Sequence, residues 1–221
     1  CSSDGTELKG ISESITDITR NPDCKIYRLT DEIVNAVVRC RSITHRLLYF
    51  SNRMEPSKEA MDLNELIREV LRVLNHAFLE RQARVDLDLA EDLPLLHADR
   101  GLLQQALFNL FNNAVEAIPV KGKILVSTRM ESVKTEDLEQ LEGSGTVFVI
   151  NIEDNGEGIS RENLEHIFEP FYTTRMGYGT GLGLSITYGI IQKHEGEITV
   201  ESEPGHGAAF IIRLPLHSTE N

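Results

Sequence analysis

Two glycine-rich segments constrain the fold of this chain more than any other feature. The first, residues 154–159, contains Gly156 and Gly158 and follows a strand-like apolar run at 147–152. The second, residues 177–184, has glycine at every other position and leads into a helix-like run at 185–191. A glycine-rich turn that opens a helix presents backbone N–H groups and the positive end of the helix dipole, which suit phosphate oxygens. Two such turns in one chain indicate a nucleotide-binding domain.

Composition narrows the class of protein. The chain has 221 residues and a formal net charge of −13 at pH 7, which is enough length for an ordinary domain with a hydrophobic core and an appendage. We expect no nucleic-acid partner, because the sequence has no basic stripe that could displace counterions. Its three cysteines, Cys1, Cys24 and Cys40, are too few and too irregularly spaced for a disulfide framework or a zinc site. They fit a reducing, cytoplasmic compartment.

No apolar run in the sequence approaches the ~20 residues of a membrane-spanning helix. Because the sequence begins with Cys1 rather than Met, we expect it to be part of a longer protein. Contact with a membrane is then expected only through parts upstream of this sequence.

Residues 1–56 have a pattern of their own. Apolar residues recur at steps of three and four on both sides of a break at Asn21 and Pro22: Leu8, Ile11, Ile15, Ile18, Ile26, Leu29, Ile33, Ala36, Cys40, Ile43, Leu47 and Phe50. This heptad spacing predicts an antiparallel helical hairpin. The hairpin is either a coiled-coil linker or half of a dimeric four-helix bundle, and its open apolar seam favours a homodimer. Residues 55–58 mark the expected boundary to a second domain over 57–221.

The second domain alternates helices and strands. Asp62 and Glu65 form a capping box that opens a helix to about Glu80, and Asp99 caps a long helix that Pro119 closes. Strands are expected at 84–89, 123–129, 146–153, 197–202 and 208–214, with an acidic surface excursion at 131–145. The order predicts an α+β fold, an α/β sandwich in which helices cover one face of a mostly antiparallel sheet.

The helix at 99–118 carries candidate metal ligands. Asn109, Asn113 and Glu116 recur at i, i+4 and i+7 along one flank of its apolar stripe. Asparagine is a poor helix former, but its carbonyl oxygen is a suitable ligand for Mg²⁺. Viewed alone, these residues are more typical of a solvated polar flank; the glycine-rich segments downstream favour the metal site instead.

Asp154 is the candidate base-recognition residue. It ends a strand just before the first glycine-rich turn, where its carboxylate could accept a hydrogen bond from the exocyclic amine of adenine. Such a charged hydrogen bond contributes ~1.5–3 kcal/mol. The alternative is an aspartate that starts an ordinary turn.

Four segments together resemble the sensor histidine kinase family in order and spacing. Residues 109–114 resemble the N box of that family, residues 154–158 its first glycine box, residues 167–174 its F box, and residues 179–184 its second glycine box. The resemblance covers about 62–216. Residues 39–48 resemble the second helix of the family's dimerisation and histidine-phosphotransfer domain.

The resemblance implies a Bergerat-type ATP-binding fold of the kind found in gyrase and Hsp90. It implies that Asn113 holds Mg²⁺, that Asn109 lies near the phosphates and metal, and that Arg175, where lysine is frequent, meets the γ-phosphate. These three would be the catalytic residues. The implied ATP contacts are Asn109, Asn113, Glu116, Asp154, Gly156, Gly158, Ile159, Phe168, Phe171, Thr173, Thr174, Arg175, Gly179, Thr180, Gly181, Leu182, Gly183 and Leu184.

The activity implied is transfer of the γ-phosphoryl group of Mg-ATP to a histidine, for relay to the receiver domain of a response regulator. None of the seven histidines lies in the family's His-Glu-hydrophobic-x-Asn-Pro box, so the acceptor is expected outside this sequence and the hairpin at 1–56 is expected to be partial. Two alternatives remain: an ATPase of the same fold that drives conformational change, and a non-catalytic nucleotide-sensing scaffold.

Overall fold

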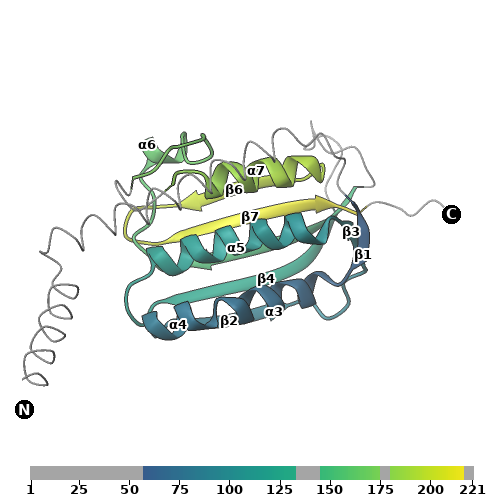
Figure 1. Ribbon diagram of the computed structural model, residues 1–221, viewed down its shortest axis with the longest axis horizontal. Coiled ribbons are helices and arrows are strands. Elements are labelled where there is room, and N and C mark those ends of the chain that lie inside the picture. Colours follow the sequence, from purple (N-terminus) through teal and green to yellow (C-terminus); the bar gives the residue numbers. More distant parts are fainter. Residues whose placement is uncertain (1–56, 133–144, 175–179, 217–221) are drawn as a thin grey trace, which may run out of the picture. The chain divides into compact units, whose positions relative to one another are not determined.

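A five-stranded sheet with a layer of helices forms the described part of the chain (Figure 1). The structure, a computed structural model, describes residues 57–132, 145–174 and 180–216, all within the unit Glu55–Asn221. The predicted hairpin at 1–56 lies outside the described residues, as do Arg175 and Gly179.

The sheet is mixed and mostly antiparallel, as predicted. Its strand order is β2 (Arg84–Leu89), β4 (Lys123–Ser132), β5 (Thr146–Asp154), β7 (Ala208–Pro215), β6 (Glu197–Ser202). Only β2 and β4 pair in parallel within this sheet. Parallel neighbours need a crossover connection, and here the chain between β2 and β4 includes the long helix α5 (Arg100–Ala117). Two further short strands, β1 (Glu59–Met61) and β3 (Leu96–Ala98), pair separately.

The helix layer consists of α3 (Leu63–Val73), α5 and α7 (Gly183–Lys193), which lie side by side in front of the sheet in Figure 1. The side chains between the two layers form the core. The largest fully buried ones are Phe111, Phe148, Leu63, Leu66, Ile67, Leu96, Leu103, Leu107, Leu110, Ile118, Ile124 and Ile150. On β7 the apolar residues alternate toward the helices, which is the period-two pattern of a strand with one covered face.

Local sequence signals fix both predicted helix starts. Asp62 Oδ1 accepts the backbone N–H of Glu65 at 3.0 Å, and Asp99 Oδ1 accepts that of Leu102 at 3.0 Å. Each side chain thereby satisfies a donor that has no partner within its helix.

Two elements differ from the prediction by more than one residue. The helix expected from Asp62 to Glu80 is interrupted at Leu74, and a separate helix α4 (Asn75–Arg81) follows. The apolar spacing of four residues continues through Val70, Leu74 and Phe78, all of which are buried, so the pattern gives no sign of the interruption. β4 extends to Ser132, three residues beyond the predicted strand, because it continues to pair with β5 as far as Thr146.

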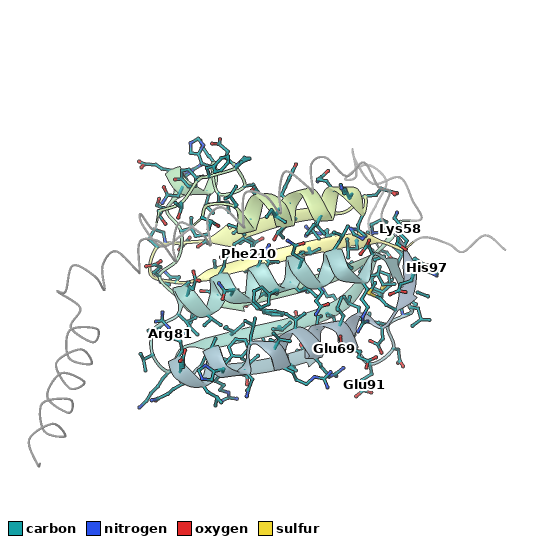
Figure 2. All side chains as sticks on the ribbon, in the orientation of Figure 1. Lys58, Glu69, Arg81, Glu91, His97 and Phe210 are labelled. Carbon is teal, nitrogen blue, oxygen red and sulfur yellow. The ribbon has the colours of Figure 1, made fainter. Side chains whose placement is uncertain are left out.

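The two ends of the helix layer are distinguishable in Figure 2. Lys58 and His97 lie at the end of β1 and β3, and Arg81, the last residue of α4, lies at the opposite end. A short helix, α6 (Arg161–Leu164), follows β5. The C-terminus of α5 and the N-terminus of α7 both point toward the end that carries α4 and α6 (Figure 1).

Candidate nucleotide-binding site

A pocket of about 380 Å³ lies between the C-terminal half of α5, the end of β5, and the start of α7. Thirteen of the residues predicted to contact a nucleotide line it: Asn109, Asn113, Glu116, Asp154, Gly158, Ile159, Thr173, Thr174, Thr180, Gly181, Leu182, Gly183 and Leu184. These residues come from segments far apart in the sequence. The fold therefore brings the four motif segments to one site.

Asp154 is the buried carboxylate of the pocket. It is the last residue of β5, and only 5% of its surface is exposed. Its Oδ1 accepts the backbone N–H of Gly156 at 2.8 Å, which fixes the side chain at the point where the strand turns. A buried carboxylate held by the backbone has a defined direction, which recognition of a base edge requires.

The first glycine-rich turn packs directly on the C-terminus of α5. A Cβ at Gly156 would lie 2.6 Å from the carbonyl oxygen of Ala117, and Glu157 donates its backbone N–H to the same oxygen at 3.2 Å. Asn155 Oδ1 also accepts the backbone N–H of Lys123 at 2.6 Å. Only glycine fits at position 156, because any side chain would displace the helix end.

The turn between β6 and β7 supports this loop from the other side, although no sequence motif pointed to it. Ser202 Oγ accepts the backbone N–H of Ile159 at 2.8 Å and donates to the Gly207 carbonyl at 2.6 Å. Gly158 has φ +70, and a Cβ there would lie 2.0 Å from the carbonyl oxygen of Glu203. The serine and glycines at 202–207 are evident in the sequence, but no local pattern indicates that they contact the first glycine-rich turn.

The α5 wall of the pocket is rich in amides. Besides Asn109 and Asn113, it includes Asn112, which the prediction omitted and whose Nδ2 donates to Glu116 Oε1 at 2.7 Å. Asn113 is half-buried. Amide oxygens are hard ligands of the kind Mg²⁺ accepts beside water and phosphate, so this wall fits the implied metal. Within the described ranges no cluster of three His, Cys, Asp or Glu side chains offers an alternative metal site.

The N-terminus of α7 forms the opposite wall. Its N-cap residue, Leu182, makes no side-chain capping hydrogen bond. The first N–H groups of a helix have no partner within it and carry partial positive charge, so this terminus suits an anion. Gly181, with φ +65, lies against the backbone of Phe171, where a Cβ would be 2.4 Å from the carbonyl carbon.

A polar cluster stands at the rim formed by α6 and the segment after it. Tyr172 Oη donates to Asn163 Oδ1 at 2.6 Å, and both residues line the pocket. The ring of His166 packs 5.5 Å from that of Tyr172, and its Nδ1 lies 2.8 Å from Glu169 Oε1. The carboxylate of Glu169 raises the pKa of His166. The predicted site residues did not include Asn163, which has no distinguishing neighbour in the sequence.

Three predicted contact residues are not among the lining residues. Gly156 lies behind the turn, against α5. Phe168 packs against Tyr188 of α7 with ring centroids 5.5 Å apart, and Phe171 is 67% exposed. Two others, Arg175 and Gly179, lie outside the described residues. Their roles remain predictions.

None of the described helices is both long and apolar enough to cross a membrane.

Comparison with known proteins places these features in a family. A family model described as "Histidine kinase-, DNA gyrase B-, and HSP90-like ATPase" matches residues 98–218. The chain is 35% identical over 218 residues to the signal transduction histidine-protein kinase AtoS of Escherichia coli (strain K12). That match covers 98% of this chain and 33% of AtoS, so the chain spans about a third of the length of this relative.

Solved structures agree. The catalytic domain of histidine kinase ThkA is 33% identical, with a TM-score of 0.60, over 72% of this chain and 95% of that one. ThkA in complex with the response regulator protein TrrA gives 27% identity and a TM-score of 0.66, over 94% and 57%. Full-length ShkA in complex with AMPPNP gives 26% and 0.62, over 76% and 33%. The predicted α+β, Bergerat-type fold is confirmed. The chain belongs to the histidine kinase-, DNA gyrase B- and HSP90-like ATPase family, and its domain is of the histidine kinase type.

Proposed function

We propose that this chain binds Mg-ATP and supplies the catalytic half of a protein-histidine kinase. The observation that carries the proposal is the polarity of the pocket. A buried carboxylate, Asp154, stands on one side, an uncapped helix N-terminus stands on another, and an amide-rich helix face lies between them. An adenine, a triphosphate and a cation match these three features in turn.

The base would bind at Asp154, whose carboxylate accepts from the exocyclic amine of adenine, with Gly158 allowing close approach. Guanine presents a carbonyl oxygen at the corresponding position. That oxygen and the Asp154 carboxylate would both be hydrogen-bond acceptors, so no hydrogen bond could form between them. The phosphates would lie toward Gly183 and Leu184 at the start of α7, where helix N–H groups point at the ligand. The complex of ShkA with AMPPNP, an adenine nucleotide analogue, supports this assignment.

The metal would be held by Asn113, with Asn109 close to the metal and phosphates. When bound, Mg²⁺ would neutralise charge on the transferring phosphoryl group. The chain's own contribution is to orient the nucleotide and keep the two amides on one helix face. Arg175 would add a cation near the γ-phosphate, and the glycines Gly179, Gly181 and Gly183 would let the segment around them close over it. Phe168 and Phe171 would anchor that segment.

The partners would be a second copy of the chain and a response regulator. The heptad pattern at 1–56 supports a homodimer, and the complex of ThkA with the response regulator TrrA supports relay to a receiver domain. The phosphoryl acceptor would be a histidine outside these 221 residues, since no histidine in the sequence lies in the family's acceptor box.

The test has two parts. Titration of the 221-residue chain with ATP and GTP, each with Mg²⁺ and with a chelator, should show binding that prefers adenine and depends on the metal. Incubation with γ-labelled ATP should leave the chain unlabelled, whereas the full-length protein should acquire acid-labile, base-stable label. Equal affinity for both nucleotides would contradict the role of Asp154. Stable label on any of the seven histidines, such as His45 in the segment that resembles the second helix of the phosphotransfer domain, would contradict an acceptor outside the sequence.

A further inference from the structure

Asn109 is hydrogen-bonded to the helix across the pocket. Its Nδ2 lies 3.1 Å from the carbonyl oxygen of Gly183 and 3.4 Å from Thr187 Oγ1. Thr187 is fully buried on α7, and its hydroxyl donates to the same Gly183 oxygen at 2.8 Å. Asn109, Gly183 and Thr187 thus form a triangle, which we term the α5–α7 clasp.

The clasp determines which end of the Asn109 amide faces α7. A carbonyl oxygen can only accept, and the single proton of the Thr187 hydroxyl is already directed to Gly183. Both partners therefore present lone pairs to Asn109, so only its NH₂ end can face them. The acceptor end, Oδ1, is not used in either of these hydrogen bonds, and the side chain lines the pocket.

From this geometry we infer that Thr187 is a positioning residue for the phosphoryl-transfer site. Together with the Gly183 carbonyl, it orients the Asn109 amide so that Oδ1 is the atom offered to the metal. This inference rests on the function proposed above. Thr187 does not line the pocket, so it would act through Asn109 rather than by touching the ligand itself. An amide fixed before the ligand arrives spares the cost of orienting it on binding.

A threonine is suited to this position because it supplies both shape and polarity. Valine has nearly the same shape but lacks the hydroxyl. With valine at position 187, the clasp would lose one acceptor for Asn109 and one donor for Gly183. Serine keeps the hydroxyl and loses one methyl group. The pair of substitutions therefore separates hydrogen bonding from packing.

The binding experiment compares the affinity for ATP with Mg²⁺ and with a chelator in four chains: wild type, Thr187→Val, Thr187→Ser and Asn109→Ala. Thr187→Val should lose about three- to tenfold in affinity for Mg-ATP, the range that one ordinary hydrogen bond gives. It should lose little for metal-free ATP, and Thr187→Ser should stay within about twofold of wild type. Equal losses with and without Mg²⁺ would overturn the inference, because a merely structural residue would weaken both.

A double-mutant cycle tests whether Thr187 acts through Asn109. In an Asn109→Ala background, Thr187→Val should cause no further loss of Mg-ATP affinity, since the side chain that it orients is gone. Independent, additive losses would show that Thr187 acts by another route and would overturn the inference.

A spectroscopic measurement on the nucleotide-free chain is independent of ATP. The side-chain NH₂ of Asn109, assigned by its loss in Asn109→Ala, should give two resolved proton signals that exchange slowly with water. They should shift in Thr187→Val and return in Thr187→Ser. A rapidly exchanging wild-type NH₂ would overturn the clasp, even if a variant failed to fold. If the clasp is present but wild type shows no dependence on Mg²⁺, the proposed function fails instead.

Discussion

His194 Nε2 accepts the backbone N–H of Asp99 at 2.9 Å and so joins the C-terminal end of α7 to the N-cap of α5. The other ring nitrogen, Nδ1, lies 2.8 Å from the carbonyl oxygen of Ile190. Because Nε2 must accept, the ring is neutral with its proton on Nδ1. This contact lies at the opposite end of α7 from the α5–α7 clasp, and His194 is only 3% exposed.

We predict that the folded chain loses stability in mild acid through this histidine. Burial is the main cause that lowers the pKa of His194 below its usual 6.5; Lys58 also lowers the pKa, while the Ile190 carbonyl, Asp99 and Glu195 oppose the change. Since the folded state favours the neutral ring, its contribution is fully present above about pH 6.5 and is lost as the pH falls below that value.

The measurement is the free energy of unfolding in urea at about pH 8 and about pH 5.5. Wild type should lose more stability between the two conditions than His194→Gln. The control is His206→Gln, whose ring is exposed, and it should follow wild type. An identical pH dependence in wild type and His194→Gln would contradict the prediction.

Asp154→Asn should weaken ATP binding at least about tenfold, because a charged acceptor is replaced by an amide. The same titration with GTP should show a smaller change. Glu153→Gln removes the neighbouring carboxylate, which is exposed on β5, and should bind ATP as wild type does. An unaffected Asp154→Asn variant would count against base recognition at this residue.

Asn113→Ala should abolish the Mg²⁺-dependent part of nucleotide binding while the fold remains intact, since Asn113 is half-buried at the edge of the core rather than inside it. Gln105→Ala, on the exposed face of the same helix, is the matched control. A loss of more than ~3 kcal/mol in the free energy of unfolding would mark Asn113 as a structural residue and remove the basis for its metal assignment.

Two glycine-to-alanine substitutions should have opposite effects on stability. Gly207 has φ +83, and a Cβ there would lie 1.8 Å from the carbonyl oxygen of Asp154, so Gly207→Ala should cost about 2–4 kcal/mol and weaken ATP binding. Gly189, inside α7, has nothing within 4 Å of an added Cβ, and Gly189→Ala should stabilise by about 0.5–1 kcal/mol. Thermal and urea denaturation of both variants test the contrast. A Gly207→Ala variant that is as stable as wild type would show that the β6–β7 turn tolerates a side chain.

Most of the fold and much of the site could be predicted because the relevant signals are local. Capping by Asp62 and Asp99 depends on residues three positions away, and the strands follow from apolar alternation. The candidate contacts in the motif segments that are described largely converge on one pocket. The interruption at Leu74 could not be predicted, because the apolar spacing continues across it.

What the sequence alone determined is which segments form the domain: glycine-rich turns, capped helices and alternating strands are all specified within a few residues. Only the tertiary structure decided how these segments constrain one another. Ser202 meets Ile159 across 43 residues, Asn109 meets Gly183 across 74, and His194 meets Asp99 across 95. Such contacts depend on the order in which strands pair and helices pack, and no local propensity encodes that order. For this reason many of the residues that form the pocket could be named from the sequence, whereas the direction of the Asn109 amide and the protonation of His194 could not.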